Sequence, residues 1–156
     1  METTKMVIIH ALNMDVTLGS LRSYCKAPLL HQNGSYTTVE GDFDDGKYFQ
    51  RYGLGLDYIP YNTVLFKNGK TEQVNINPCS FSVFPMAYHI LLEGGNNEIF
   101  DNFESVFTLN QLNRLKQIVK IYKNNGFEIT GAYEHNPGSH SPGFLVAQLM
   151  KTLGYE

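Results

Sequence analysis

Cysteine is scarce in this sequence, and long hydrophobic runs are absent. The two cysteines, Cys25 and Cys79, are too few for a disulfide framework and lack the Cys-x-x-Cys spacing of metal and redox motifs. No apolar run is long enough to cross a bilayer, and the N-terminus lacks the charged start and apolar centre of a signal peptide. We therefore expect a cytoplasmic protein with reduced thiols and no membrane partner.

Charged residues are also few. They make up 17% of the chain, against 42% hydrophobic and 13% aromatic residues, which indicates a globular protein rather than a disordered chain or a coiled coil. The net charge is -3, lysine and arginine are spread along the sequence without a basic stripe, and residues 40–45 are acidic. These features predict no nucleic-acid partner. A chain of 156 residues fits a single domain over 1–156.

The N-terminal third begins with a strand pattern, followed by a helix pattern and an aromatic segment. Residues 5–10 form a nearly continuous apolar run that ends at His10, which is typical of a central strand. Thr17 is a suitable N-cap for a short helix that extends to Cys25. Residues 29–57 combine turn formers with aromatic rings and predict an ordered insertion. Its rings either bind a sugar, a base or a partner chain, or fill a satellite core.

A β-hairpin is the clearest local prediction in the middle of the chain. Residues 58–67 and 70–74 are rich in β-formers and flank Asn68-Gly69, a pair typical of tight hairpin turns. We expect residues 75–85 to form a loop. Residues 86–92 predict another strand, which the following glycines end.

The C-terminal third alternates helix and strand patterns. Thr108 is the expected N-cap of a helix with one apolar stripe, formed by Leu109, Leu112, Leu115, Ile118, Val119 and Tyr122. Residues 127–130 predict a strand and residues 145–153 a helix. Strands alternate with helices except at the hairpin, so the sequence predicts an α/β fold with a central mixed β-sheet flanked by helices.

The connection between the last strand and the last helix, residues 131–144, is rich in polar side chains. It carries His135, His140, Glu134 and two Pro-Gly breakers. Connections of this kind often carry function. The pattern is typical either of half of a metal site or of the remnant of one.

Five short motifs follow one another along these elements. They are Val-Ile-Ile-His at 7–10, Tyr-Asn-Thr-Val-Leu-Phe-Lys-Asn-Gly at 61–69, Gly-Gly at 94–95, Phe-Thr-x-x-Gln at 107–111, and a loop with Glu134, Pro137 and Ser-Pro-Gly-Phe at 141–144. Their order resembles that of the zinc-dependent N-acetylmuramoyl-L-alanine amidases of the phage-lysozyme type and of the related peptidoglycan recognition proteins. The resemblance covers most of the chain apart from about 29–57 and implies an amidase-like α/β fold.

The resemblance also implies that the inherited chemistry is lost. Those amidases hold zinc with two histidines and a Cys or Asp, and leave the fourth position to a water molecule. His10 matches the first ligand, but Ala132 and Ser141 stand at the second and third positions. Tyr61 matches the tyrosine that assists the reaction, and Gly138 stands where some members carry a lysine. We therefore expect no zinc, no other cofactor and no catalytic residue.

The resemblance leaves one enzymatic alternative open. A divergent N-acetylmuramoyl-L-alanine amidase, a peptidoglycan hydrolase, would use a rebuilt zinc site formed by His10 with His135 or His140, together with Tyr61. The simpler interpretation is that His10 forms a hydrogen bond within a vestigial cleft and that the other two histidines lie on a surface loop.

Two further chemistries are alternatives of lower weight. Cys25 or Cys79 could act as a nucleophile beside His89 or His10, although no signature surrounds them. Glu134 could act as a general base, or it accepts backbone hydrogen bonds at a turn.

The preferred hypothesis is a catalytically inactive, phage-encoded protein that binds a partner in the vestigial cleft. The partner is a small ligand, such as a nucleotide-like signal or a muropeptide that the protein sequesters, or a host protein that it inhibits. The expected ligand-binding residues are His10, Tyr61, Asn62, Glu134, His135, His140 and Ser141.

Overall fold

Strand β1 (Met6–Leu12) lies inside the main sheet and provides the first candidate residue, His10. The structure is a computed structural model and describes residues 5–12, 16–26, 29–30, 36–37, 56, 58–81, 83–95 and 99–155. The chain divides into two compact units, one of 1–15 with 61–156 and one of 16–60. The expectation of a single domain over 1–156 stays a prediction.

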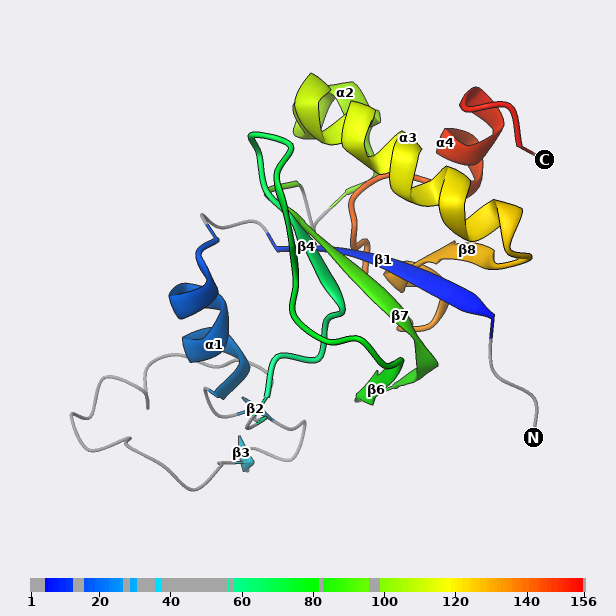
Figure 1. The fold of residues 1–156 in the computed structure, drawn as a ribbon. Helices are drawn as coiled ribbons and strands as arrows, with labels where there is room; N and C mark the ends of the chain where they lie inside the picture. The colour runs from blue at the N-terminus through cyan, green and yellow to red at the C-terminus, as the bar shows by residue number, and fades with distance from the viewer. Residues whose placement is uncertain are drawn as a thin grey trace. The chain divides into compact units, whose positions relative to one another are not determined.

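The larger unit contains a mixed sheet with the strand order β5-β4-β7-β1-β8 (Figure 1). The strands beside β1 are β4 (Thr63–Leu65), β5 (Thr71–Gln73), β7 (Phe84–Glu93) and β8 (Glu128–Gly131). β1 runs parallel to β7 and β8, and β4 runs parallel to β7, whereas β5 is antiparallel to β4. The predicted α/β fold with a central mixed sheet is confirmed.

Alternation along β1 separates two faces of this sheet. Val7, Ile9 and Ala11 are buried in the core on one face, and Ile8 packs with small side chains on the other. His10 has the same parity as Ile8, so its side chain belongs to the second face.

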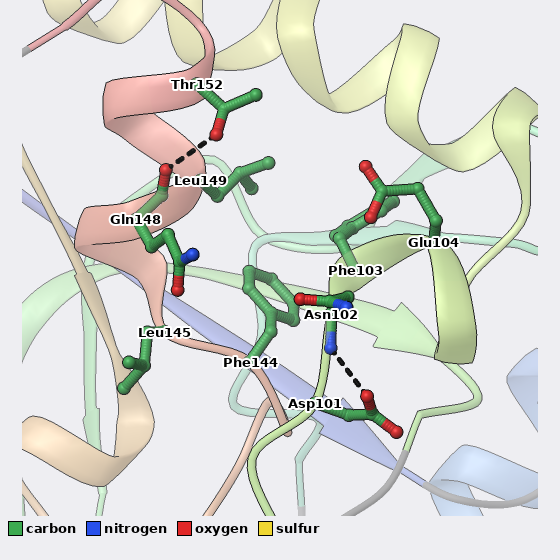
Figure 2. A pocket seen from close by; sticks show the side chains of 9 residues that line it. All are labelled: Asp101, Asn102, Phe103, Glu104, Phe144, Leu145, Gln148, Leu149 and Thr152. Atoms are coloured by element: carbon green, nitrogen blue, oxygen red, sulfur yellow. Dashed lines mark hydrogen bonds between the residues drawn. The ribbon is translucent and has the colours of Figure 1, made fainter.

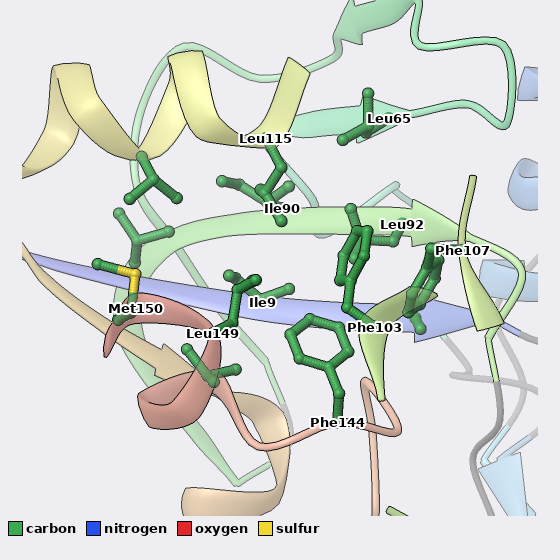
Figure 3. Close-up of a cluster of buried hydrophobic side chains, with 14 residues drawn as sticks. Ile9, Leu65, Ile90, Leu92, Phe103, Phe107, Leu115, Phe144, Leu149 and Met150 are labelled. Atoms are coloured by element: carbon green, nitrogen blue, oxygen red, sulfur yellow. The ribbon is translucent and has the colours of Figure 1, made fainter. Parts of the chain in front are cut away.

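The helices α2 (Phe103–Val106), α3 (Leu109–Asn124) and α4 (Val146–Thr152) lie together on the first face (Figure 1). The core between them and the sheet includes aliphatic and aromatic side chains from strands, helices and the segment before α4 (Figure 3). They include Ile9, Leu65, Ile90, Leu92, Phe103, Phe107, Leu115, Phe144, Leu149 and Met150. The main apolar core therefore lies on the helix side, and a smaller apolar cluster with the buried His10 lies on the other face.

The predicted Asn68-Gly69 turn joins β4 to β5. Gly69 has a φ of 86°, a conformation that favours glycine. The side-chain oxygen of Asn68 accepts a hydrogen bond from the Lys70 N–H at 2.9 Å, and the Phe66 N–H donates to the Lys70 carbonyl at 2.9 Å. The hairpin is confirmed, with strands shorter than the β-rich runs.

A capping box begins α3, as the sequence predicts. The Thr108 hydroxyl accepts from the Gln111 N–H at 3.1 Å, and the Gln111 side-chain oxygen accepts from the Thr108 N–H at 3.0 Å. The Gln111 amide also donates to the carbonyls of Glu93 at 2.9 Å and Leu65 at 3.3 Å. The cap therefore ties the helix to both β7 and β4.

Three elements differ from the sequence-based expectation. Residues 75–85, expected as a loop, contain β6 (Cys79–Phe81), which pairs antiparallel with β7. The short helix α2 and the 3-10 turn η2 (Ala132–Glu134) were also not expected. These elements are three or four residues long, so their local pattern is weak and neighbouring segments decide their conformation.

The smaller unit contains α1 (Leu18–Lys26), β2 (Leu29–Leu30) and β3 (Tyr36–Thr37), and the last two pair antiparallel. The Thr17 hydroxyl accepts from the Ser20 N–H at 3.0 Å, which confirms the predicted start of the helix. Most of the insertion expected over 29–57 lies outside the described residues. No helix within the described residues is long and apolar enough to span a bilayer.

Candidate functional site

Two histidines share a hydrogen bond on the second face of the sheet. Nε2 of His10 in β1 lies 2.8 Å from Nδ1 of His89 in β7. In the parallel register His89 pairs with Ile8, so His10 is two residues further along the same face. His10 is 4% exposed and His89 is fully buried. The pair is therefore part of the interior of the unit.

Hydrogen-bond partners determine which ring nitrogens carry protons. Nε2 of His89 lies 2.9 Å from the Cys79 carbonyl, which can only accept, so the neutral His89 ring carries its proton on Nε2. Its Nδ1 then accepts the Nε2–H of His10. The neutral His10 ring consequently has its lone pair on Nδ1, and no described residue forms a hydrogen bond with that atom.

Burial keeps both rings in the neutral form. Desolvation lowers the pKa of His10 well below its usual value, and the neighbouring His89 and His135 lower it further. Desolvation also lowers the pKa of His89 to about 4, although the Cys79 and Pro85 carbonyls oppose this shift. Near neutral pH the site therefore offers uncharged imidazoles rather than cations.

Aromatic rings surround the histidine pair. The His10 ring centroid lies 5.2 Å from that of Tyr61, 4.7 Å from that of Phe84 and 5.6 Å from that of Phe81. The Tyr61 and Phe84 rings meet His10 edge-on. Tyr61, which the sequence named with His10 as a candidate binding residue, therefore contacts His10.

Asn62 holds the segment next to the pair. Its buried side-chain oxygen accepts from the His89 N–H at 2.8 Å. Its amide nitrogen donates to the Asn75 carbonyl at 3.1 Å and to the Asn77 carbonyl at 2.6 Å. Asn62 therefore holds residues 75–77, which lead into β6. It thereby helps to position the Cys79 carbonyl that orients His89.

Ser141 joins the 131–144 connection to β1. Its hydroxyl accepts from the Ala11 N–H at 3.0 Å and lies 3.4 Å from the Ala11 carbonyl, to which it can donate. β8 pairs with β1 only as far as Ile9 opposite Gly131, so Ser141 extends hydrogen bonding along that edge of β1 beyond the end of β8. Ala132, 1% exposed, packs with Ile8 and Ala87.

The remaining residues of the predicted site have separate partners. Glu134 accepts from the Gly131 N–H at 2.7 Å, which is the turn role considered for it. His140 packs against Phe100 with ring centroids 4.8 Å apart and ring planes tilted by 59°. Nε2 of His135 lies 3.0 Å from the Thr130 hydroxyl, and His135 also influences the pKa of both buried histidines. Of these three residues, His135 is the one electrostatically coupled to the pair.

The cysteines lack the environment of nucleophiles. Burial raises the pKa of Cys25 to about 12 and raises the pKa of Cys79 above its usual value. Both are free thiols, and the Cys79 thiol lies 3.5 Å from the Asn77 carbonyl, to which it can donate. A reactive cysteine needs a stabilised thiolate, so neither site favours covalent catalysis.

Three solved structures share this architecture. The N-acetylmuramoyl-L-alanine amidase LysC from Clostridium intestinale URNW is 15% identical with a TM-score of 0.61, over 98% of this chain and 87% of that chain. The endolysin LysCS, an N-acetylmuramoyl-L-alanine amidase from the same organism, is 16% identical with a TM-score of 0.56, over 98% and 85%. A selenomethionine derivative of AmpD is 12% identical with a TM-score of 0.53, over 97% and 85%. The chain has an amidase-like fold.

Identities this low establish the fold alone. No family model matches the sequence. No curated protein matches it either. Activity therefore has to be inferred from the residues of the site.

The side chains of this amidase-like fold do not fit the zinc ion that the family resemblance implies. A methyl group at Ala132 cannot coordinate a metal, and the Ser141 hydroxyl is engaged with the backbone of β1. Within the described residues, no group of three or more His, Cys, Asp or Glu side chains could hold a metal ion. His10 is paired with His89 in this arrangement.

A cavity elsewhere in the amidase-like fold is too small to be a substrate site. It lies between the start of α2 and α4 and has a volume of about 60 Å³ (Figure 2). Its walls include Phe103, Phe144 and Leu149, and Asp101 beside it accepts from the Asn102 N–H at 2.8 Å. Ligand pockets usually enclose about 300–1,000 Å³, so this one suits a few water molecules.

Sequence reasoning missed the partners of His10. It named His89 only as a partner for a cysteine and gave no role to Phe81 or Phe84. A histidine in the apolar run 86–92 was the available signal, because a buried polar residue requires a partner. Identifying His10 as that partner required the register between β1 and β7.

Proposed function

We propose that this protein is a non-catalytic member of the amidase-like folds and that it acts by binding. The observation that carries the proposal is the chemistry at two positions of the 131–144 connection. Ala132 is a buried methyl, and Ser141 forms backbone hydrogen bonds with Ala11, where the family resemblance places two zinc ligands. Without these ligands the fold lacks the zinc-activated water that the amidases of this resemblance use.

The proposed binding site is at the histidine pair. His10 and Tyr61 pack together there, each 4% exposed, and His135 lies close enough to influence the pKa of His10. The proposed partner is a small molecule, such as a nucleotide-like signal or a muropeptide that the protein sequesters, or a host protein that it inhibits. A phage origin is part of this proposal, and the endolysin among the similar structures supports it.

Two assays on the same protein preparation distinguish a hydrolytic function from a binding function. We expect no release of peptides from peptidoglycan or muropeptides, with or without added zinc. Ligands present at about 100 times their dissociation constant should stabilise the fold by about 2.7 kcal/mol in a thermal-shift screen. The His10→Leu variant serves as the matched control for a ligand bound at the histidine pair.

One observation favours the second candidate, a divergent amidase with a rebuilt zinc site. The His10 ring donates from Nε2 to His89, and its Nδ1 has no hydrogen bond to any described residue; metal-bound histidines commonly have such a supporting hydrogen bond. This candidate predicts chelator-sensitive cleavage that is lost in His10→Leu and His135→Leu. If activity appears only after Ala132→His and Ser141→Cys are introduced together, the second candidate is abandoned.

A protein partner without a small ligand is distinguished by capture and stability measurements. Specific retention of one host protein by the wild-type chain, with no stabilisation by any screened ligand, would assign the site to protein inhibition. Stabilisation by a nucleotide or a muropeptide that His10→Leu abolishes would assign it to a small ligand.

A further inference from the structure

Lysines that are scattered in the sequence gather on one surface of the helical layer. The 16 residues of α3 include Arg114, Lys116, Lys120 and Lys123 and no acidic residue, and α4 carries Lys151 and no acidic residue. Lys116 and Lys120 are four residues apart and therefore project from one side of the helix. Helices α3 and α4 consequently carry a local positive charge on a protein whose net charge is -3.

A groove lies between these lysines and the C-terminal end of α4. It is lined by Lys116, Lys120, Thr152, Leu153 and Tyr155 and has a volume of about 290 Å³. Both lysines are exposed, and neither forms an ion pair with any described residue. The groove thus combines two lysines that no described residue pairs with and an apolar and aromatic wall.

The wall of the groove is held in place by the end of α4. Gly154 has a φ of 95°, and its N–H donates to the Lys151 carbonyl at 3.1 Å. The Tyr155 N–H donates back to the Met150 carbonyl at 2.8 Å, which completes a Schellman motif. The ammonium group of Lys123 then lies 5.9 Å from the centre of the Tyr155 ring. Tyr155 is therefore positioned by both the backbone and a cation.

We propose that this groove between α3 and α4 binds a small phosphorylated molecule with at least two negative charges. Lysine ammonium groups bind phosphate as point charges, and a single carboxylate would leave the paired lysines undercompensated. A nucleic-acid duplex fits poorly, because duplex binding typically uses about 6–10 phosphate contacts and this surface offers fewer cations. The rest of the ligand packs on Leu153 and Tyr155. This site is separate from the histidine pair and does not depend on the proposed function.

Pyrophosphate is the probe for this site, with inorganic phosphate and acetate as comparisons at matched ionic strength. In ¹H–¹⁵N correlation spectra, we expect saturable shifts of the amides of 116–123 and 152–155 with pyrophosphate, weaker shifts with phosphate, and none with acetate. The Lys116→Gln/Lys120→Gln variant should bind pyrophosphate at least tenfold more weakly. Lys70→Gln, at an exposed lysine of the hairpin turn, should bind like the wild type.

The double variant should keep the dispersed spectrum of the wild type, because both positions are exposed and glutamine is a good helix former. Non-saturable shifts, equal pyrophosphate affinity in the double variant, or equal shifts with acetate would overturn the proposal. Tight binding of vesicles containing phosphatidylglycerol through the same lysines, without competition by pyrophosphate, would also overturn it by assigning the surface to a membrane.

Discussion

At the residue scale, the hydrogen bond between His10 and His89 gives a partner to one buried ring nitrogen of each residue. We predict that His89→Leu lowers the free energy of unfolding by about 1–3 kcal/mol, because the His10 Nε2–H and the Cys79 carbonyl lose their partner. Urea denaturation measures the effect. In the His10→Leu/His89→Leu variant the loss should be smaller than the sum of the two single losses. Additive losses would show that the hydrogen bond does not couple the two residues.

The neutral state of the pair makes stability depend on pH. Both folded-state pKa values lie below the ordinary value near 6.5, so the unfolded chain binds more protons below that pH. Their contribution to stability is complete above about pH 6.5 and is lost as pH falls toward about 4, the pKa of His89. Each ring adds a slope of up to about 1.4 kcal/mol per pH unit. Urea midpoints between pH 7.5 and 5 measure it.

The matched control for the pH series is the His10→Leu/His89→Leu variant. All other ionisable groups are present in both proteins, so the difference between the two curves reports on the pair. A difference in stability that does not change across this range would contradict neutral burial of the two rings.

At the element scale, Ser141 ties the 131–144 connection to β1. We predict that Ser141→Ala costs about 1–2 kcal/mol, since the Ala11 N–H loses its acceptor in a partly buried position. Ser139→Ala is a comparison in the same connection, because among the described residues the Ser139 hydroxyl accepts one hydrogen bond, from the Ser141 N–H at 3.2 Å, and forms none with β1. Chemical denaturation should show the larger loss for Ser141→Ala, and the reverse order would contradict the assigned role.

Gln111 joins α3 to two strands and should be sensitive to change. Gln111→Leu removes the capping-box oxygen and leaves the Glu93 and Leu65 carbonyls without this donor. We expect a loss of about 2–3 kcal/mol, compared with less than about 0.5 kcal/mol for the exposed Asn113→Ala on the same helix. Thermal unfolding of the three proteins tests the order, and equal midpoints for Gln111→Leu and wild type would contradict it.

Elements with local signals could be predicted from the sequence, and those that depend on distant partners could not. The capping box of Thr108 and Gln111 and the Asn68-Gly69 turn are formed by neighbours in the chain. The three-residue strand β6 forms by pairing with β7, so its local pattern does not reveal it. The histidine pair depends on the register of two strands that are far apart in sequence.

At the scale of the whole molecule, the order of the motifs predicted the fold. The spacing of lysines along the sequence did not show that they lie together once α3 and α4 have formed. The chain has the amidase-like fold that the order of its motifs implied. The sequence-based interpretation of scattered lysines was incomplete, because α3 and α4 carry five basic residues and no acidic one. The expectation that nucleic acid is not a partner stays a prediction.

Zinc content tests the central claim most directly, because Ala132 and Ser141 stand where the fold resemblance places two ligands. The measurement is elemental analysis of wild type and His10→Leu, both produced with added zinc and purified without chelator. We predict far less than one zinc ion per chain in both proteins and an unfolding temperature that EDTA does not change. Near-stoichiometric zinc in the wild type that is lost in His10→Leu would contradict the account.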